Sequence, residues 1–125
     1  DPALVLSFQP HMHFRGDRML LEAIHVDGRR EILIDVNKYE QTWQLVYPFK
    51  EPHLFPKGTV LHNVTWHDNT SNNRHNPDPS AWIGWGGRTM DEMGHGWSDI
   101  AFMTEEQYEE RLSKQQKERT TNNDQ

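Results

Sequence analysis

The segment Leu4–Gly16 has the sequence LVLSFQPHMHFRG, an apolar run that ends in the histidine pair His11 and His13. In a β-strand, successive side chains point to opposite faces, so His11 and His13 share one face and Met12 points away. A regular alternation places Leu4, Leu6, Phe8 and Met12 on the apolar face, and Val5, Ser7 and Gln9 on the histidine face. The segment therefore predicts a strand that packs on one side and presents two imidazoles on the other.

Two imidazoles on one face of a strand can bind one metal ion, because histidine is the commonest metal ligand in proteins. The chain has 8 histidines in 125 residues, so a close pair also arises by chance. The alternative interpretation is a pair of hydrogen-bonded or exposed structural histidines. A third ligand is needed to favour a metal site, and without cysteine it must be a histidine, a carboxylate or a methionine thioether.

Length and charge restrict the classes of protein to consider. A chain of 125 residues is long enough for one domain. The net charge of −6 and the scattered lysines and arginines argue against nucleic acid or an anionic membrane as partner. No apolar run approaches the roughly 20 residues that cross a bilayer. The chain opens at Asp1-Pro2 without a methionine, and we expect a mature form or a fragment of a longer protein.

Short alternating segments separated by turn residues predict an all-β fold. Asp27-Gly28 is the preferred two-residue hairpin turn, residues 51–58 read as a loop, and the polar segment Asn69–Ser80 reads as a surface loop. Pro48 favours an edge strand or a strand end. We expect an antiparallel, jelly-roll-like β-sandwich over residues 1–103. The expected strands lie at 4–8, 19–26, 32–36, 43–49 and 59–67, with a last strand that ends at Met103.

One helix is expected after the sandwich. Thr104 and Gln107 form a capping-box pattern, and residues 104–119 are acidic at the start and basic at the end. Only Tyr108 and Leu112 line one face, so the helix should dock lightly, project, or meet another chain. Residues 120–125 are predicted to form a disordered tail.

The segment Thr89–Gly96 offers candidates for the third metal ligand. It lies between a glycine turn and the last predicted strand, where the backbone can bend toward a neighbouring strand. Two neutral imidazoles with a thioether suit copper, above all Cu(I), and suit zinc poorly. The candidate side chains in this segment are Met90, Asp91, Glu92, Met93 and His95.

The chain resembles the C-terminal domain of the copper type II, ascorbate-dependent monooxygenases. This family includes peptidylglycine alpha-hydroxylating monooxygenase, dopamine beta-monooxygenase and bacterial relatives, which resemble the chain most. The domain is marked by a His-x-His strand and a later Asp-Glu-Met, here His11-Met12-His13 and Asp91-Glu92-Met93. The resemblance extends from about Phe8 to Trp97. Further matching patterns are Arg15-Gly16, Trp43-Gln44, Glu51-Pro52, Pro56-Lys57-Gly58-Thr59, Asp68-Asn69, Asn76-Pro77-Asp78-Pro79 and Trp85-Gly86.

The resemblance implies one copper ion, cycling between Cu(I) and Cu(II), held by His11, His13 and Met93. At this copper the family binds dioxygen and hydroxylates a small-molecule substrate. A second copper, bound by three histidines of a preceding domain or of a redox partner, supplies an electron from ascorbate as the external reductant. The resemblance also implies a periplasmic or extracellular location.

Several interpretations stay open at this stage. Met93 can instead fill a gap in the core. Asp91 and Glu92 can hydrogen-bond a ligating imidazole from outside the ligand shell, or can be solvated turn residues. The copper site can belong to half of a monooxygenase or to a non-catalytic module for copper transfer, sensing or structure, and the latter is favoured for the isolated chain. A cupin-like iron, manganese or zinc site that adds Asp17 and His62 to the histidine pair is the third hypothesis.

Overall fold

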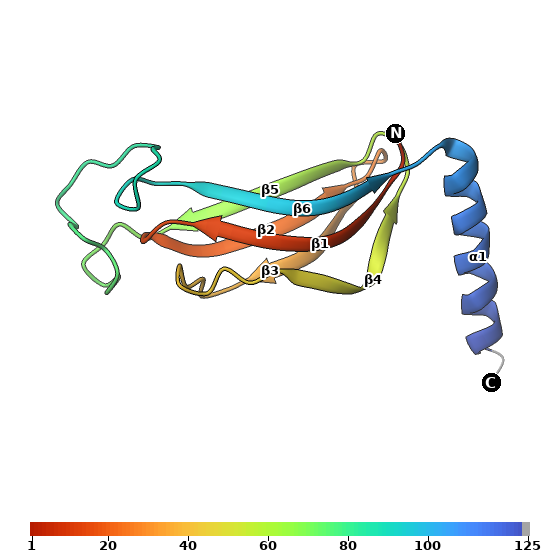
Figure 1. Ribbon diagram of the computed structural model, residues 1–125, viewed down its shortest axis with the longest axis horizontal. Coiled ribbons are helices and arrows are strands. Elements are labelled where there is room, and N and C mark those ends of the chain that lie inside the picture. The colour runs from red at the N-terminus through yellow and green to blue at the C-terminus, as the bar shows by residue number, and fades with distance from the viewer. Residues whose placement is uncertain (124–125) are drawn as a thin grey trace.

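A computed structural model describes residues 1–123 and shows six strands followed by one helix (Figure 1). The strands are β1 (Ala3–Met12), β2 (Gly16–Ile24), β3 (Arg30–Val36), β4 (Tyr47–Phe55), β5 (Val60–His67) and β6 (Gly94–Phe102), and the helix is α1 (Glu105–Asn123).

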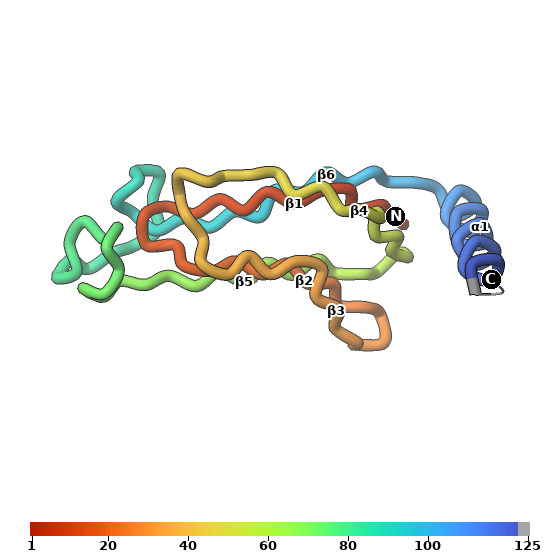
Figure 2. Tube along the Cα trace, turned by 90° about the horizontal axis from the view of Figure 1, so that it is seen from below, coloured from red at the N-terminus to blue at the C-terminus, as the bar shows by residue number. Residues whose placement is uncertain are grey.

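The strands form two three-stranded antiparallel sheets, one in the order β4-β1-β6 and the other in the order β3-β2-β5. Figure 2 shows the sheets as two stacked layers. The expected antiparallel β-sandwich with one C-terminal helix is thus confirmed. The buried side chains between the layers form two clusters, one of Phe8, Met12, Met19, Leu21 and Tyr39 and the other of Val5, Ala23 and Phe55.

Strand β1 departs from regular alternation at Leu6. Its register with both β4 and β6 shifts between Val5 and Ser7. Val5 is 1% exposed and packs in the core, whereas Leu6 is 38% exposed. The faces predicted for Val5 and Leu6 were therefore wrong, because a bulge residue reverses the order of side chains along a strand. Beyond the bulge, Phe8 and Met12 face the core as predicted.

The connection between β2 and β3 is longer than the expected two-residue turn. The His25 amide donates to the Arg29 carbonyl at 2.9 Å, and the Gly28 amide donates to the His25 carbonyl at 2.8 Å. Within this connection, Gly28 is the residue with a positive φ, of 84°. A turn followed by a left-handed glycine is the usual three-residue hairpin loop, so Asp27-Gly28 is not the two-residue turn that was predicted.

Strand β4 begins and ends later than the sequence predicted. The segment from Trp43 to Val46 lies before the strand, which starts at Tyr47 and continues through Pro52 to Phe55. The predicted loop at 51–58 is reduced to the turn around Gly58, whose φ is 89°. Strand β4 is at the edge of its sheet, as Pro48 suggested. An edge strand tolerates prolines, because the missing amide donor can face away from the neighbouring strand.

The helix begins with the predicted capping box. The Gln107 amide donates to Thr104 Oγ1 at 3.2 Å, and the Thr104 amide donates to Gln107 Oε1 at 3.0 Å. The helix runs to Asn123, so its predicted end at Arg119 and the tail predicted from Thr120 were wrong for residues 120–123. Residues 124–125 lie outside the described part. Figure 1 shows α1 beside one end of the sandwich, with its axis running across the direction of the strands.

Within residues 1–123, no helix has both the length and the apolar character to span a bilayer.

Candidate metal centre

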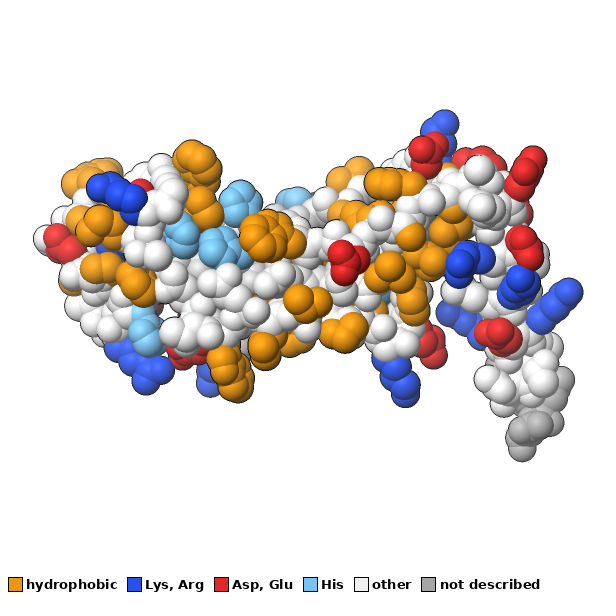
Figure 3. All heavy atoms as spheres, in the orientation of Figure 1, with side chains coloured by type: hydrophobic (Ala, Val, Ile, Leu, Met, Phe, Trp, Pro, Cys, Tyr) orange, Lys and Arg blue, Asp and Glu red, His pale blue; other side chains and the backbone are white. Residues whose placement is uncertain are grey.

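The histidine pair lies at the end of β1, where β1 pairs with the start of β6. His11 is opposite His95, and Met12 is opposite Gly94. The paired residues end at Met12 and Gly94, and the same register continued by one residue would place Met93 opposite His13. Directly opposite residues of an antiparallel pair extend to the same side of the sheet, so Met93 would then share the face of the two imidazoles. Figure 3 shows histidine side chains gathered over this end of β1 and β6.

The two imidazoles have a separation that fits a shared ion. Their ring centres are 5.2 Å apart, and their planes meet at 85°. When an imidazole nitrogen binds a metal, the ring centre lies about 3 Å from the ion. Two rings can therefore reach one ion across this separation. His13 is 5% exposed and His11 is partly exposed, so the pair opens to solvent on the side of His11.

Gln44 determines which nitrogen of His11 carries the proton. His11 Nδ1 lies 2.7 Å from Gln44 Oε1. The side-chain amide of Gln44 is oriented through its nitrogen, because Gln44 Nε2 donates to the Gln41 carbonyl at 3.1 Å. Nδ1 must then be the donor, which leaves the lone pair of a neutral ring on Nε2, free for a metal.

The ring of His13 is fixed in the same way by the backbone. Its Nδ1 lies 3.1 Å from the carbonyl oxygen of Asp91. A carbonyl oxygen only accepts, so Nδ1 carries the proton and Nε2 keeps its lone pair. Both imidazoles thus present Nε2, the arrangement in which a metal-binding histidine gives its other nitrogen to an acceptor.

Two side chains of β6 flank the ring of His11. The His95 ring is stacked on it at 6.1 Å with planes 19° apart, and the Trp97 ring is stacked at 5.8 Å with planes 8° apart. His95 and Trp97 therefore lie beside the His11 ring, with their ring planes nearly parallel to it.

Asp91 and Glu92, which precede β6, make hydrogen bonds through their backbone groups. Asp91 contacts His13 through its carbonyl oxygen, while its carboxylate accepts from the backbone amide and guanidinium of Arg88. Arg88 lowers the pKa of this carboxyl below its usual value. The Glu92 amide donates to the Gly84 carbonyl, and the Glu92 carbonyl accepts from the Gly86 amide. The sequence analysis left two roles open for these carboxylates, and the Asp91 carboxylate is bound to Arg88 rather than to an imidazole.

The cupin-like set is not assembled. His62 belongs to the other sheet, where its Nδ1 lies 2.7 Å from Glu22 Oε1. The next residue, Asn63, faces inward and contacts the Gly96 amide, so His62 points outward. Asp17 is exposed and is the second residue of strand β2. More generally, no group of three or more histidine, aspartate and glutamate side chains within residues 1–123 is placed to hold a metal ion.

Arg15 was not identified as a site residue from the sequence. It is the largest fully buried side chain, 1% exposed, in the turn after the histidine pair. Its guanidinium donates to Asn69 Oδ1 at 2.8 Å and to the Met90 carbonyl. The carbonyls of Met90 and Asp91, which are consecutive, are therefore bound by Arg15 and His13. Arg15 holds in place the backbone that fixes the tautomer of His13.

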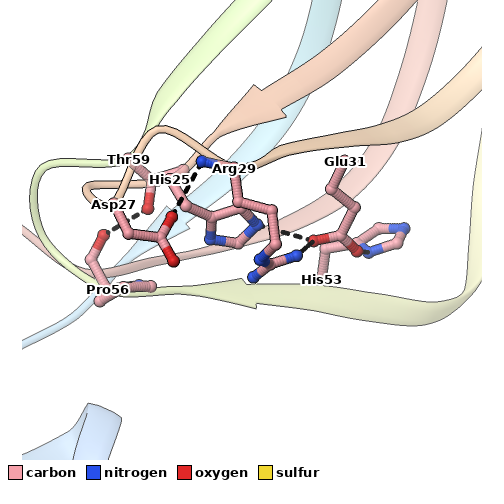
Figure 4. A network of polar contacts seen from close by, with 7 residues as sticks. All are labelled: His25, Asp27, Arg29, Glu31, His53, Pro56 and Thr59. Atoms are coloured by element: carbon pink, nitrogen blue, oxygen red, sulfur yellow. Dashed lines mark hydrogen bonds and ion pairs between the residues drawn. The ribbon is translucent and has the colours of Figure 1, made fainter.

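A second group of histidines lies at the other end of the sandwich and joins the two sheets (Figure 4). Glu31 of β3 accepts from His25 at 2.8 Å and lies 3.9 Å from His53 of β4. Arg29 is 3.8 Å from the same carboxylate. Phe55 lies against both imidazole rings, with ring centres 5.7 Å from His25 and 6.0 Å from His53. These contacts connect the β2–β3 hairpin to the edge strand β4.

The chain was compared with protein-family models, curated proteins and solved structures. No family model, curated protein or solved structure matches it.

Proposed function

We propose that the chain binds one copper ion through His11, His13 and Met93, and that it is the oxygen-binding half of a copper monooxygenase. The main support is the pairing of β1 with β6. Its register, continued by one residue past Met12 and Gly94, would bring Met93 opposite His13, and both imidazoles have Nδ1 at an acceptor, which leaves Nε2 for a metal. Two neutral imidazoles and a thioether form a soft ligand set that suits copper.

The residues around the ligands supply binding and orientation. Gln44 and the Asp91 carbonyl fix the two tautomers, and Trp97 limits rotation of the His11 ring. Bound copper would supply one-electron redox chemistry and a coordination position for a small molecule. Ascorbate and a three-histidine copper domain, in the same or another chain, are the proposed electron source.

The decisive experiment measures which metal binds and through which atoms. The purified chain is loaded with copper and examined by elemental analysis, Cu(II) electron paramagnetic resonance and Cu(I) X-ray absorption. We expect one copper per chain and a copper–sulfur scattering path. Met93→Ala should remove this path. Met90→Ala is the matched control, because it removes a thioether three residues away and should leave the path intact.

Two results would contradict the proposal. One is unchanged copper binding in the double variant His11→Ala/His13→Ala. The other is a copper–sulfur path that persists in Met93→Ala. If copper binds as proposed, joining the chain to its partner domain separates the functions. Ascorbate-dependent oxygen uptake indicates the monooxygenase, whereas copper binding without uptake indicates the non-catalytic module for transfer, sensing or structure.

A further inference from the structure

A pocket of about 550 Å³ lies beside the histidine pair, among the loops that connect β5 to β6. Figure 1 shows these loops at the end of the sandwich opposite α1. One wall includes Pro77 and Asp78 of the polar loop. The segment from Met90 to Asp91 forms another wall and separates the pocket from His13, since the Asp91 carbonyl is the acceptor for His13.

The rim of this pocket carries exposed aromatic side chains. Trp82 is 101% exposed and Trp85 is 77% exposed, although tryptophan is among the side chains that gain most from burial. Ile83 and Met90 add further apolar lining. Exposed apolar surface grouped around a hollow is typical of a ligand site. These side chains can bury one face of a flat, apolar molecule.

The lining of the pocket includes Arg15, whose side chain is 1% exposed. A buried charge is normally paired with an opposite charge, because its desolvation is costly. Within residues 1–123, the hydrogen-bond acceptors of this guanidinium are one amide oxygen and two backbone carbonyl oxygens, none of them a carboxylate. The guanidinium can therefore accept an anionic partner from the pocket.

Neither acidic residue of the pocket lining hydrogen-bonds Arg15 through its carboxylate, although the charge of Arg15, after the hydrogen bonds from Ser80, contributes to lowering the pKa of Asp78. The Asp78 carboxylate accepts from the Ser80 amide at 2.9 Å and from the Ser80 hydroxyl at 2.6 Å. Only its backbone carbonyl accepts from Arg15, at 3.4 Å, a long bond that a better acceptor can replace. The Asp91 carboxylate is held by Arg88 at the rim.

We propose that this pocket binds a small aromatic carboxylate. Its carboxylate pairs with Arg15, whose planar donor fork matches a carboxylate, and its ring packs on Trp82 and Trp85. The proposal does not depend on copper, because none of its contacts involves His11, His13 or Met93.

The test uses the metal-free chain, so that it is independent of the proposed copper site. Phenylacetate is titrated into the protein by isothermal titration calorimetry, with phenylacetamide and acetate as comparison probes. We expect one phenylacetate per chain, and binding at least about tenfold weaker for each comparison probe, since one lacks the charge and the other the ring. No binding of phenylacetate at millimolar concentration, or equal binding of phenylacetamide, overturns the proposal.

Variants locate the binding in the pocket. Trp82→Ala changes a fully exposed side chain, so the variant should fold. It should weaken the binding of phenylacetate at least about fivefold, because the stacking contact with the ring is lost. Trp66→Ala is the matched control, because Trp66 lies on β5 against Arg18 and outside the pocket. Equal weakening by both variants, or none by Trp82→Ala, overturns the proposal.

Discussion

The hydroxyl group of Tyr39 binds both backbone polar groups of Met12, accepting from its amide and donating to its carbonyl, each at 3.0 Å. Strand β4 pairs with β1 only as far as Phe8, opposite Tyr47. Beyond that point this side of β1 has no neighbouring strand, and Tyr39 supplies the missing partners. Because Met12 lies between His11 and His13, the buried tyrosine also fixes the backbone that carries the proposed ligands.

Replacing Tyr39 with phenylalanine should destabilise the protein. The substitution leaves the amide and carbonyl of Met12 buried without their partner, which costs about 1–3 kcal/mol in the free energy of unfolding. Chemical denaturation followed by tryptophan fluorescence measures this change. Tyr108→Phe, on the projecting helix, is the control and should change the free energy by less than about 0.5 kcal/mol. Equal stability of the two variants would contradict this account of Tyr39.

The same tyrosine should make stability fall in alkaline solution. Burial raises the pKa of Tyr39 above its usual value. The neutral phenol is then favoured in the folded state, so its stabilising effect is complete below the unfolded pKa of about 10 and is lost as pH rises through the folded pKa. Denaturation experiments between pH 9 and 11 should show that the free energy of unfolding falls in the parent protein, and that it falls less in Tyr39→Phe. If the free energies of unfolding of the two proteins changed in parallel with pH, the loss of stability would not come from Tyr39.

Gln44 should influence copper affinity without touching the metal. Gln44→Ala removes the acceptor for His11 Nδ1 and should weaken copper binding about 10–100-fold, as is usual when the outer partner of a ligating histidine is lost. Competition with a chelator of known affinity measures the change. In Gln41→Ala the backbone carbonyl that orients Gln44 remains, so this control should keep its affinity. The same affinity in Gln44→Ala and parent would show that Gln44 does not act through His11.

The close approach of β6 to the core should make Gly96 sensitive to substitution. A Cβ at this position would lie 2.7 Å from Phe8 Cε2 and 2.8 Å from Asn63 Cγ, and the first of these is a core side chain. Gly96→Ala should cost about 1–3 kcal/mol in stability. At Gly87 a Cβ meets no atom within 4 Å, so Gly87→Ala provides a matched control. Thermal unfolding of both variants tests the difference, and equal melting temperatures would contradict it.

Local patterns in the sequence predicted much of the fold. Alternation and turn residues identified most of the strands, and Thr104 and Gln107 identified the start of the helix. These features depend on neighbours a few residues apart, so they can be read along the chain. The bulge at Leu6 could not be read in this way, because it depends on how β1 pairs with β4 and β6 at the same time.

The sequence by itself determined that His11 and His13 share a face, since two residues of one strand separated by a single residue must do so. Only the tertiary structure decided what surrounds them. The pairing of β1 with β6 placed His95 opposite His11, and loops distant in sequence brought Gln44 and Tyr39 to the same end of the sandwich and the Met90 carbonyl to Arg15. Such contacts join residues 27 to 84 positions apart, and the side chains that form them carry no periodic signal that would reveal their partners.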